Sequence, residues 1–312
     1  MRTSSSPICS VLALVSAGSV LISGCADRRS SIDAAVGADV IEAPDVASSD
    51  APFLRPDTGD APASPDPVFV YAHTRTTLYR FEPSTATLTR LGDFDCVSSV
   101  GSPSDTSDGM TDLAIDADGH LFGVGRTEPG SDEARLVSVD SSSGRCSVIA
   151  RVTLDGVGTP VQGLGFMPSG TLDPSADVLV GMGGSGEYFR IDPSTAVATR
   201  VATVEAPSDT RGGDFVAILG ASAWIVSTDG TLVGFDPATG RTLSATSIDD
   251  PTTSDNIGMG LGFWGGTVYA FTYAGRILAI DTRAGTTTVV PTTGSEALSF
   301  RGAAVTTVAP LI

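Results

Sequence analysis

Hydrophobic and polar residues alternate in short runs along most of the chain after residue 68, and helical spacing is hard to find. The stretch "GRILAIDTRAGTTTVVP" from Gly275 shows the pattern: alternation over residues 277–281, a turn, and then a Thr/Val-rich run. A period of two is that of a β-strand, because successive side chains point to opposite faces. The stretch therefore predicts two strands joined by a turn.

This strand–turn–strand stretch occurs five times. The five segments are "LYRFEPSTATLTRL" from Leu78, "LVSVDSSSGRCSVI" from Leu136, "YFRIDPSTAVATRV" from Tyr188, "LVGFDPATGRTLSA" from Leu232 and "ILAIDTRAGTTTVV" from Ile277. Aspartate accepts hydrogen bonds from backbone N–H groups two residues on, proline presets φ, and glycine supplies a positive φ. Each repeat therefore predicts one antiparallel hairpin.

Two further candidate strands precede each of the last four hairpins. They are "MTDLAID" and "HLFGVG", "VQGLGFM" and "DVLVGMG", "GGDFVAIL" and "AWIVST", and "GMGLGFW" and "TVYAFT". Units of four strands that recur roughly every 50 residues indicate a β-propeller.

The two ends of the repetitive region predict how the propeller closes. The first unit holds three strands, and "RGAAVTTVAP" from Arg301 aligns without a gap to "RGGDFVAILG" from Arg211. We therefore expect an all-β, five-bladed propeller over residues 68–312, in which residues 302–308 pair with residues 68–73. Closure of this kind removes an exposed strand edge. A solenoid of sheets is the alternative, but it would not need split ends.

The repeats resemble those of bacterial YVTN-type and quinoprotein-like propellers, whose blades carry Asp-Pro-x-Thr-Gly at the same hairpin, as in "DPATG" from Asp236. The resemblance covers residues 68–312 and implies the architecture, not an activity, because unrelated functions share it. Quinone-cofactor enzymes carry a tryptophan shortly after the Thr-Gly, whereas "RTLSA" follows here. No cofactor is therefore expected.

The first 24 residues read as a signal peptide. Arg2 precedes an apolar run that is too short for a membrane span and that ends in Ile-Ser-Gly-Cys at Cys25. This ending resembles the lipobox of bacterial lipoproteins, which implies cleavage before Cys25 and its lipidation. An ordinary cleaved signal with a chance cysteine is the alternative. Lipidation would place the protein at the cell envelope, at the outer membrane or cell surface, with the membrane as its first partner.

Residues 25–67 form a linker of different composition, rich in Ala, Asp, Pro and Ser with almost no aromatic residues. Such a segment cannot bury enough apolar surface to order itself, so we expect a disordered acidic tether.

Composition excludes some functions. The formal net charge is −18, and all 18 basic residues are arginine. An acidic chain repels phosphate backbones, which argues against nucleic acid as a partner, and the absence of lysine excludes Schiff-base chemistry.

Two cysteines remain after the signal and the lipidated residue, Cys96 and Cys146. An exported protein lies in an oxidising compartment, where they can form a disulfide. However, Cys96 follows the outer strand of the first blade and Cys146 begins that of the second, which places them on opposite faces. A disulfide and two free thiols both stay open.

Carboxylates are the candidate ligand-binding groups. In the aligned innermost strands one slot holds Asp112, Gly163, Asp214, Gly260 and Ala304. Asp112 and Asp214, with Gln162, could bind a polar ligand or a cation such as Ca²⁺ near the mouth of the channel. The alternative is that they solvate the channel or cap neighbouring turns.

The two histidines, His73 and His120, are expected at the surface or at hairpin ends, and no cluster predicts a zinc site. The "DADG" sequence at residues 116–119 has the spacing of a calcium loop, but it lies where a hairpin must turn. A turn is the favoured interpretation, so no metal is assigned.

No assembled acid–base or nucleophile set appears in the sequence, which argues against an enzyme. We expect a monomeric, lipid-anchored binding or scaffold module for a protein, sugar or small molecule. A metal-dependent envelope hydrolase or lactonase that uses the channel carboxylates is the alternative, and a purely structural envelope component is a third.

Overall fold

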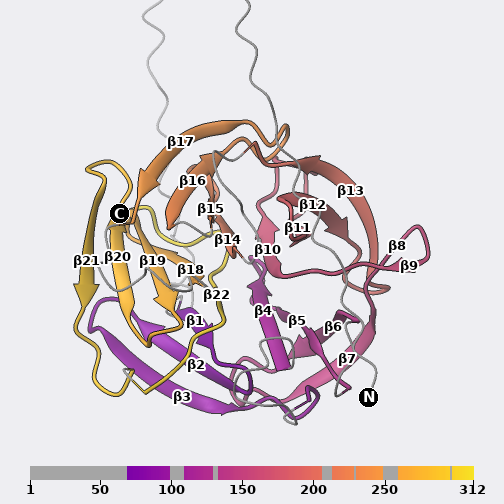
Figure 1. Ribbon diagram of the computed structural model, residues 1–312, viewed down its shortest axis with the longest axis horizontal. Coiled ribbons are helices and arrows are strands. Elements are labelled where there is room, and N and C mark those ends of the chain that lie inside the picture. The colour runs from indigo at the N-terminus through magenta and orange to yellow at the C-terminus, as the bar shows by residue number, and fades with distance from the viewer. Residues whose placement is uncertain are drawn as a thin grey trace, which may run out of the picture. The chain divides into compact units, whose positions relative to one another are not determined.

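The computed structural model describes residues 69–98, 109–128, 133–205, 213–227, 230–248, 259–295 and 297–312. These residues form five sheets arranged as blades around an axis, and all of their strand pairs but one are antiparallel (Figure 1). The expected all-β, five-bladed propeller is therefore confirmed. The predicted signal peptide, the predicted lipidation site Cys25 and the predicted tether lie outside the described residues. The described residues include no helix that is long and apolar enough to span a membrane.

The blades are numbered in chain order, and the strands of each blade are given from the innermost to the outermost. Blade 1 comprises β22 (Gly302–Ala304), β1 (Val70–His73), β2 (Thr77–Glu82) and β3 (Thr87–Asp93). Blade 2 comprises β4 (Gly109–Ile115), β5 (Leu121–Arg126), β6 (Arg135–Val139) and β7 (Cys146–Arg151). Blade 3 comprises β10 (Gly163–Met167), β11 (Val178–Met182), β12 (Glu187–Ile191), β13 (Val197–Thr203), β8 (Thr153–Leu154) and β9 (Val157–Gly158). Blade 4 comprises β14 (Phe215–Ala217), β15 (Ala223–Val226), β16 (Thr231–Phe235) and β17 (Thr242–Ser247). Blade 5 comprises β18 (Met259–Trp264), β19 (Thr267–Thr272), β20 (Ile277–Asp281) and β21 (Thr286–Val290).

The ring closes within blade 1. Strand β22 from the C-terminal end pairs antiparallel with β1, and the paired residues are Tyr71 with Ala304, Ala72 with Ala303 and His73 with Gly302. This confirms the predicted seam, although the ladder covers only residues 302–304 of the expected 302–308. Because the seam is so short, other contacts must help to hold β22.

The core lies between neighbouring blades, whose apolar faces pack against one another. Trp224 of blade 4 stacks on Phe263 of blade 5, with ring centroids 5.7 Å apart. Phe81 of blade 1 meets Phe271 of blade 5 edge-on, with centroids 5.6 Å apart. Aromatic contacts of this kind add to the area buried between the blades. Each blade therefore buries its apolar faces only when its neighbours are in place.

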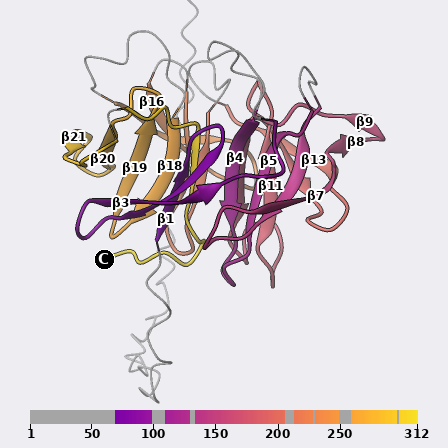
Figure 2. The ribbon, with the colours of Figure 1, turned by 90° about the horizontal axis from the view of Figure 1, so that it is seen from below.

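The repeated turns form the joints of the outer rim. Twist turns outer strands such as β3 and β7 along the rim, across the direction of the inner strands (Figure 2). The N–H of Thr153 donates to Ala196 O at 3.2 Å, and that of Glu205 donates to Gly240 O at 2.8 Å. The fifth position of every turn has a positive φ, whether it is alanine or glycine: Ala86, Gly144, Ala196, Gly240 and Gly285. The repeat therefore encodes both a hairpin and its contact with the preceding blade.

The same joint brings Cys96 and Cys146 together in a disulfide, with their Cα atoms 5.4 Å apart. The expectation that they lie on opposite faces is wrong. It treated the outer strands as parallel to the axis, whereas twist leads β3 around the rim to the start of β7. Asp95 Oδ1 also accepts a hydrogen bond from the N–H of Cys146 at 2.8 Å, which reinforces the joint.

An additional hairpin extends blade 3. Strands β8 and β9 pair with each other, and β8 adds in parallel to the outer edge of β13. Asp155 and Gly156 join them with φ values of 53° and 79°. Asp-Gly between two strands is a strong hairpin signal that the sequence analysis did not use.

Candidate functional site at the propeller axis

The innermost strands β4, β10, β14, β18 and β22 gather around the axis (Figure 1). One axial position recurs near the start of these strands, and its five residues are Asp112, Gly163, Asp214, Gly260 and Gly302. We call these residues, together with His73, the axial hub. Two carboxyl groups thus share a ring with three glycines.

The fifth member corrects the sequence alignment, which placed Ala304 in this ring. Asp214 Oδ2 accepts hydrogen bonds from the N–H groups of Leu261 and Ala303, which follow Gly260 and Gly302 directly. Ala304 instead lies two residues further along β22. A shift of two residues preserves the alternation of a strand, so a gap-free alignment cannot detect it.

The hub carboxyl groups accept hydrogen bonds from the inner edges of the blades. Asp112 Oδ1 accepts from the N–H of Leu113 at 2.9 Å, and Asp112 Oδ2 accepts from that of Leu164 at 2.7 Å. Asp214 Oδ2 accepts from the N–H of Leu261 at 2.6 Å and from that of Ala303 at 3.1 Å. Inner-edge N–H groups have no strand partner of their own. Because Asp112 comes from blade 2 and Asp214 from blade 4, the two side chains join all five blades at the axis.

Burial perturbs the ionisation of both hub aspartates. Asp112 is 1% exposed, and Asp214 is 3% exposed. Burial, followed by the charge of Asp214, raises the pKa of Asp112 well above its ordinary value. Burial also raises the pKa of Asp214 to about 7, against the opposing hydrogen bonds from Asp112 and from the backbone. A low-dielectric site disfavours two adjacent carboxylates, so the pair retains a proton near neutrality.

His73 lies beside this pair and is fully buried, so the expectation of a surface residue is wrong, although it does end β1. Its Nδ1 bonds the carbonyl oxygen of Thr74 at 2.8 Å, which makes Nδ1 the protonated nitrogen and leaves Nε2 as an acceptor. Nε2 lies 3.9 Å from Asp112 Oδ1 and has no hydrogen-bond partner among the described residues. Burial lowers the pKa of His73 to about 4, so the ring is neutral at physiological pH. Sequence reasoning missed it because neither alternation nor spacing reports burial at a strand end.

Gln162 is not part of the hub. Its N–H donates to Met182 O at 2.8 Å, while the residue itself is exposed. The next residue, Gly163, takes the hub position. The structure therefore brings together two of the three predicted ligand-binding residues.

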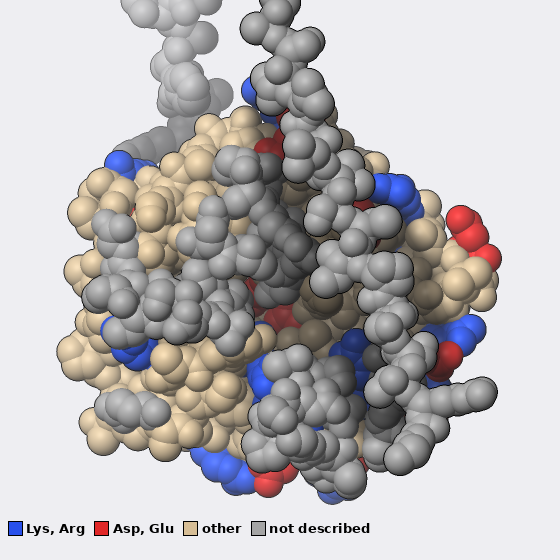
Figure 3. Space-filling view, viewed as in Figure 1, with Lys and Arg blue, Asp and Glu red and all other residues tan. Residues whose placement is uncertain are grey.

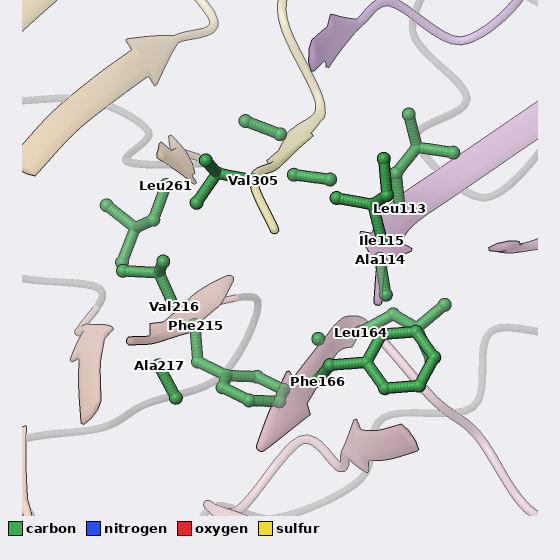
Figure 4. Close-up of a pocket in the computed structure, with 13 residues that line it drawn as sticks. Leu113, Ala114, Ile115, Leu164, Phe166, Phe215, Val216, Ala217, Leu261 and Val305 are labelled. Carbon is green, nitrogen blue, oxygen red and sulfur yellow. The ribbon is translucent and has the colours of Figure 1, made fainter. Parts of the chain in front are cut away.

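Along the axis the space is narrow and apolar. The cavity has a volume of about 10 Å³ and is lined by inner-strand side chains that include Leu113, Leu164 and Leu261 (Figure 4). This volume corresponds to about one water molecule. In the space-filling view along the axis, acidic atoms are visible at the centre of the face (Figure 3). Between the described inner strands, this cavity has no room for a substrate.

The C-terminal residues cross one end of the axis. Thr307 Oγ1 donates to Asp177 Oδ2 at 2.6 Å in blade 3, and Thr307 O accepts from the N–H of Leu219 at 2.8 Å in blade 4. Pro310 O accepts from the N–H of Gly265 at 2.9 Å in blade 5. These contacts anchor the chain beyond β22 and close that end of the axis.

A second group of ionisable side chains lies at the β4–β5 turn, where Asp116, Asp118 and His120 place potential ligand atoms within 4.8 Å of one another. Asp116 Oδ1 accepts from the N–H groups of Asp118 and His120, and Asp116 Oδ2 contacts His120 Nδ1 at 2.9 Å. That hydrogen bond raises the pKa of His120. The aspartate thus organises the turn, in agreement with the favoured interpretation of "DADG".

Comparison with solved structures finds proteins of low sequence identity. The BamB structure from Moraxella catarrhalis is 17% identical with a TM-score of 0.33, over 72% of this chain and 59% of that one. A putative 6-phosphogluconolactonase from Bacteroides fragilis is 16% identical with a TM-score of 0.38, over 74% of this chain and 83% of that one. Citrobacter koseri AztD is 11% identical with a TM-score of 0.37, over 75% of this chain and 73% of that one. These likenesses are too weak to carry a functional argument.

No curated protein matches the chain. A family model described as outer membrane protein assembly factor BamB matches residues 97–307, which is more than half of the chain. The expected quinoprotein-like propeller architecture is thereby confirmed, and the chain belongs to the family described as outer membrane protein assembly factor BamB.

Proposed function

We propose that this protein is a non-catalytic binding or scaffold module of the bacterial cell envelope that acts in outer membrane protein assembly. The observation that carries the proposal is the state of the axial hub. Its carboxyl groups accept backbone hydrogen bonds from four blades, and both carboxyl groups are buried. Catalysis needs a reacting group within hydrogen-bond reach of a bound substrate. The hub therefore supports a structural role, and the family membership supports the assembly process.

The proposed address is a lipid anchor on Cys25, at the outer membrane or cell surface. The lipobox-like sequence before Cys25 supports it, and more than one acyl chain makes such anchoring stable. Metabolic labelling with a palmitate analogue should mark the wild-type chain but not Cys25→Ser. Labelling of the variant would contradict the anchor.

A deletion strain tests the scaffold role. We expect the amount of folded β-barrel protein in its outer membrane to fall at least twofold, and wild-type chain to restore it. Asp112→Asn, which keeps the shape of the side chain, should restore it equally once circular dichroism shows a folded ring. An unchanged β-barrel level in the deletion strain would refute the proposal.

Alanine variants of the hub aspartates test the alternative, a metal-dependent hydrolase or lactonase that uses Asp112 and Asp214. That alternative predicts a melting temperature that rises with Ca²⁺ in the wild type and no longer rises in Asp112→Ala or Asp214→Ala. The burial of both carboxyl groups gives it less support. We also propose that the protein is a monomer, which light scattering of the purified chain tests directly.

A further inference from the structure

The axial hub has an incomplete hydrogen-bond arrangement that requires a proton. Asp214 Oδ1 is buried and receives no hydrogen bond from the donors of the described residues. The neighbouring groups are also acceptors, because both oxygens of Asp112 accept backbone N–H groups and His73 Nε2 carries a lone pair. A buried acceptor without a donor costs about 1–3 kcal/mol. A proton on Asp112 is the donor that the Asp112–Asp214 pair itself can supply.

The hub is joined directly to the seam that closes the ring. Asp214 Oδ2 accepts a hydrogen bond from the N–H of Ala303 in β22, and His73 lies opposite Gly302 in the ladder between β1 and β22. A Cβ atom on Gly302 would overlap Asp112 Oδ1 and His73 Nε2, so β22 packs directly against the pair. Besides the hub, β22 is held by a ladder of three residue pairs with β1 and by the contacts of Thr307 and Pro310 beyond it.

We infer that the ring is closed by a proton-dependent latch: a proton shared by Asp112 and Asp214 holds β22 at the axis, and its release loosens the seam between β22 and β1. Loss of the proton places two carboxylates side by side in a buried site. Their repulsion acts on the N–H of Ala303 and on the shortest ladder of blade 1.

The surrounding charges do not compensate for this change. From β1 the facing group is His73, which is neutral, and from β10 and β18 the hub residues are glycines. Next to β22 the nearby cation is Arg301, which affects His73 and lies over the ring of Tyr273, 4.7 Å from its centroid. The pair therefore keeps a proton in the closed ring.

The sign of the effect follows from linkage. The closed ring raises the pKa of Asp214 from an ordinary 3.8 to about 7, so opening releases a proton between these two values. Stability of the seam is complete below pH 3.8 and is lost as the pH rises to about 7. The contribution of Asp112, whose pKa is also raised, extends the loss to higher pH. One proton changes the opening equilibrium by about tenfold per pH unit within this window.

Hydrogen exchange of the full chain tests the latch. After correction for the intrinsic rate, the opening equilibrium of peptides that contain residues 302–305 should rise by about tenfold per pH unit from pH 5 to pH 7. In Asp112→Asn the side chain at this position carries no titratable proton, so this slope should be at most half as steep. Asp192→Asn, in an exposed turn, is the matched control and should keep the wild-type slope.

Infrared spectroscopy of the wild type provides a test that needs no variant. The latch predicts that the spectrum at pH 6 contains the carbonyl band of a protonated, buried carboxyl group. The intensity of this band should fall as the pH rises above 7, with the same pH dependence as the opening of the seam peptides. Absence of the band at pH 6, or seam exchange that is independent of pH in the wild type, would overturn the inference.

Discussion

The disulfide between Cys96 and Cys146 allows the rim joint between blades 1 and 2 to be tested quantitatively. The perturbation is the double variant Cys96→Ser/Cys146→Ser. The bond joins the end of one outer strand to the hairpin of the next blade across a sequence separation of 50 residues. Without the disulfide, only the backbone connects Cys96 to Cys146 in the unfolded chain.

Chain entropy sets the magnitude. Cross-links that close loops of 15 and 100 residues are worth about 3 and about 4.7 kcal/mol, so a 50-residue loop corresponds to about 4 kcal/mol. The folded joint keeps its hydrogen bond from the N–H of Cys146 to Asp95, so most of the loss lies in the unfolded state. We expect the free energy of unfolding to fall by about 4 kcal/mol.

Urea unfolding with and without reductant measures this effect. Reductant should shift the wild-type midpoint to that of the double variant and leave the variant unchanged. The denaturant dependence should also increase, because the unfolded chain without the cross-link is less compact. Two results together would refute the reasoning. The wild-type midpoint would not respond to reductant, and the sulfurs of Cys96 and Cys146 in the folded propeller would react with a thiol reagent.

Three further predictions concern single positions. Gly302→Ala should lower the free energy of unfolding by more than about 2 kcal/mol in the urea assay, because the new Cβ overlaps the Asp112 carboxyl group. Gly158→Ala is the control, and its Cβ would make only ordinary van der Waals contacts with Arg151. This control should change the free energy of unfolding by less than about 0.5 kcal/mol. Ala86→Gly should stabilise by about 0.5 kcal/mol, since Ala86 holds a φ of 52° that glycine adopts without strain; a melting temperature below that of the wild type would contradict this. Hydrogen bonds within its turn lower the pKa of Asp192, so its contribution is present above pH 3.8 and is lost as the pH falls below it; Asp192→Ala should therefore show a smaller loss of stability than the wild type between pH 5 and pH 2, measured by circular dichroism.

The hub and the rim stabilise the same ring by different chemistry. At the rim, the exposed aspartates of four repeated turns receive hydrogen bonds within their own turn, which lowers their pKa values. At the axis, burial raises the pKa values of Asp112 and Asp214. The two groups therefore respond to pH in opposite directions, and the ring should be most stable in mildly acidic solution.

Much of the architecture follows from the sequence alone. The alternation in each strand and the turn chemistry after Asp140, Asp192, Asp236 and Asp281 depend on residues close together in the chain. The five blades and the closing strand could be inferred from these local signals, as could the axial location of Asp112 and Asp214.

Only the tertiary structure decided how these parts meet. The hub contains Gly302 and not Ala304, because a two-residue shift leaves the alternation of β22 unchanged. Cys96 bonds to Cys146 because sheet twist leads β3 along the rim, a direction that strand order does not specify. His73 is buried because β22 and blade 2 cover the end of β1. Register across the seam, twist and burial depend on residues far apart in the chain, and local sequence patterns do not report them.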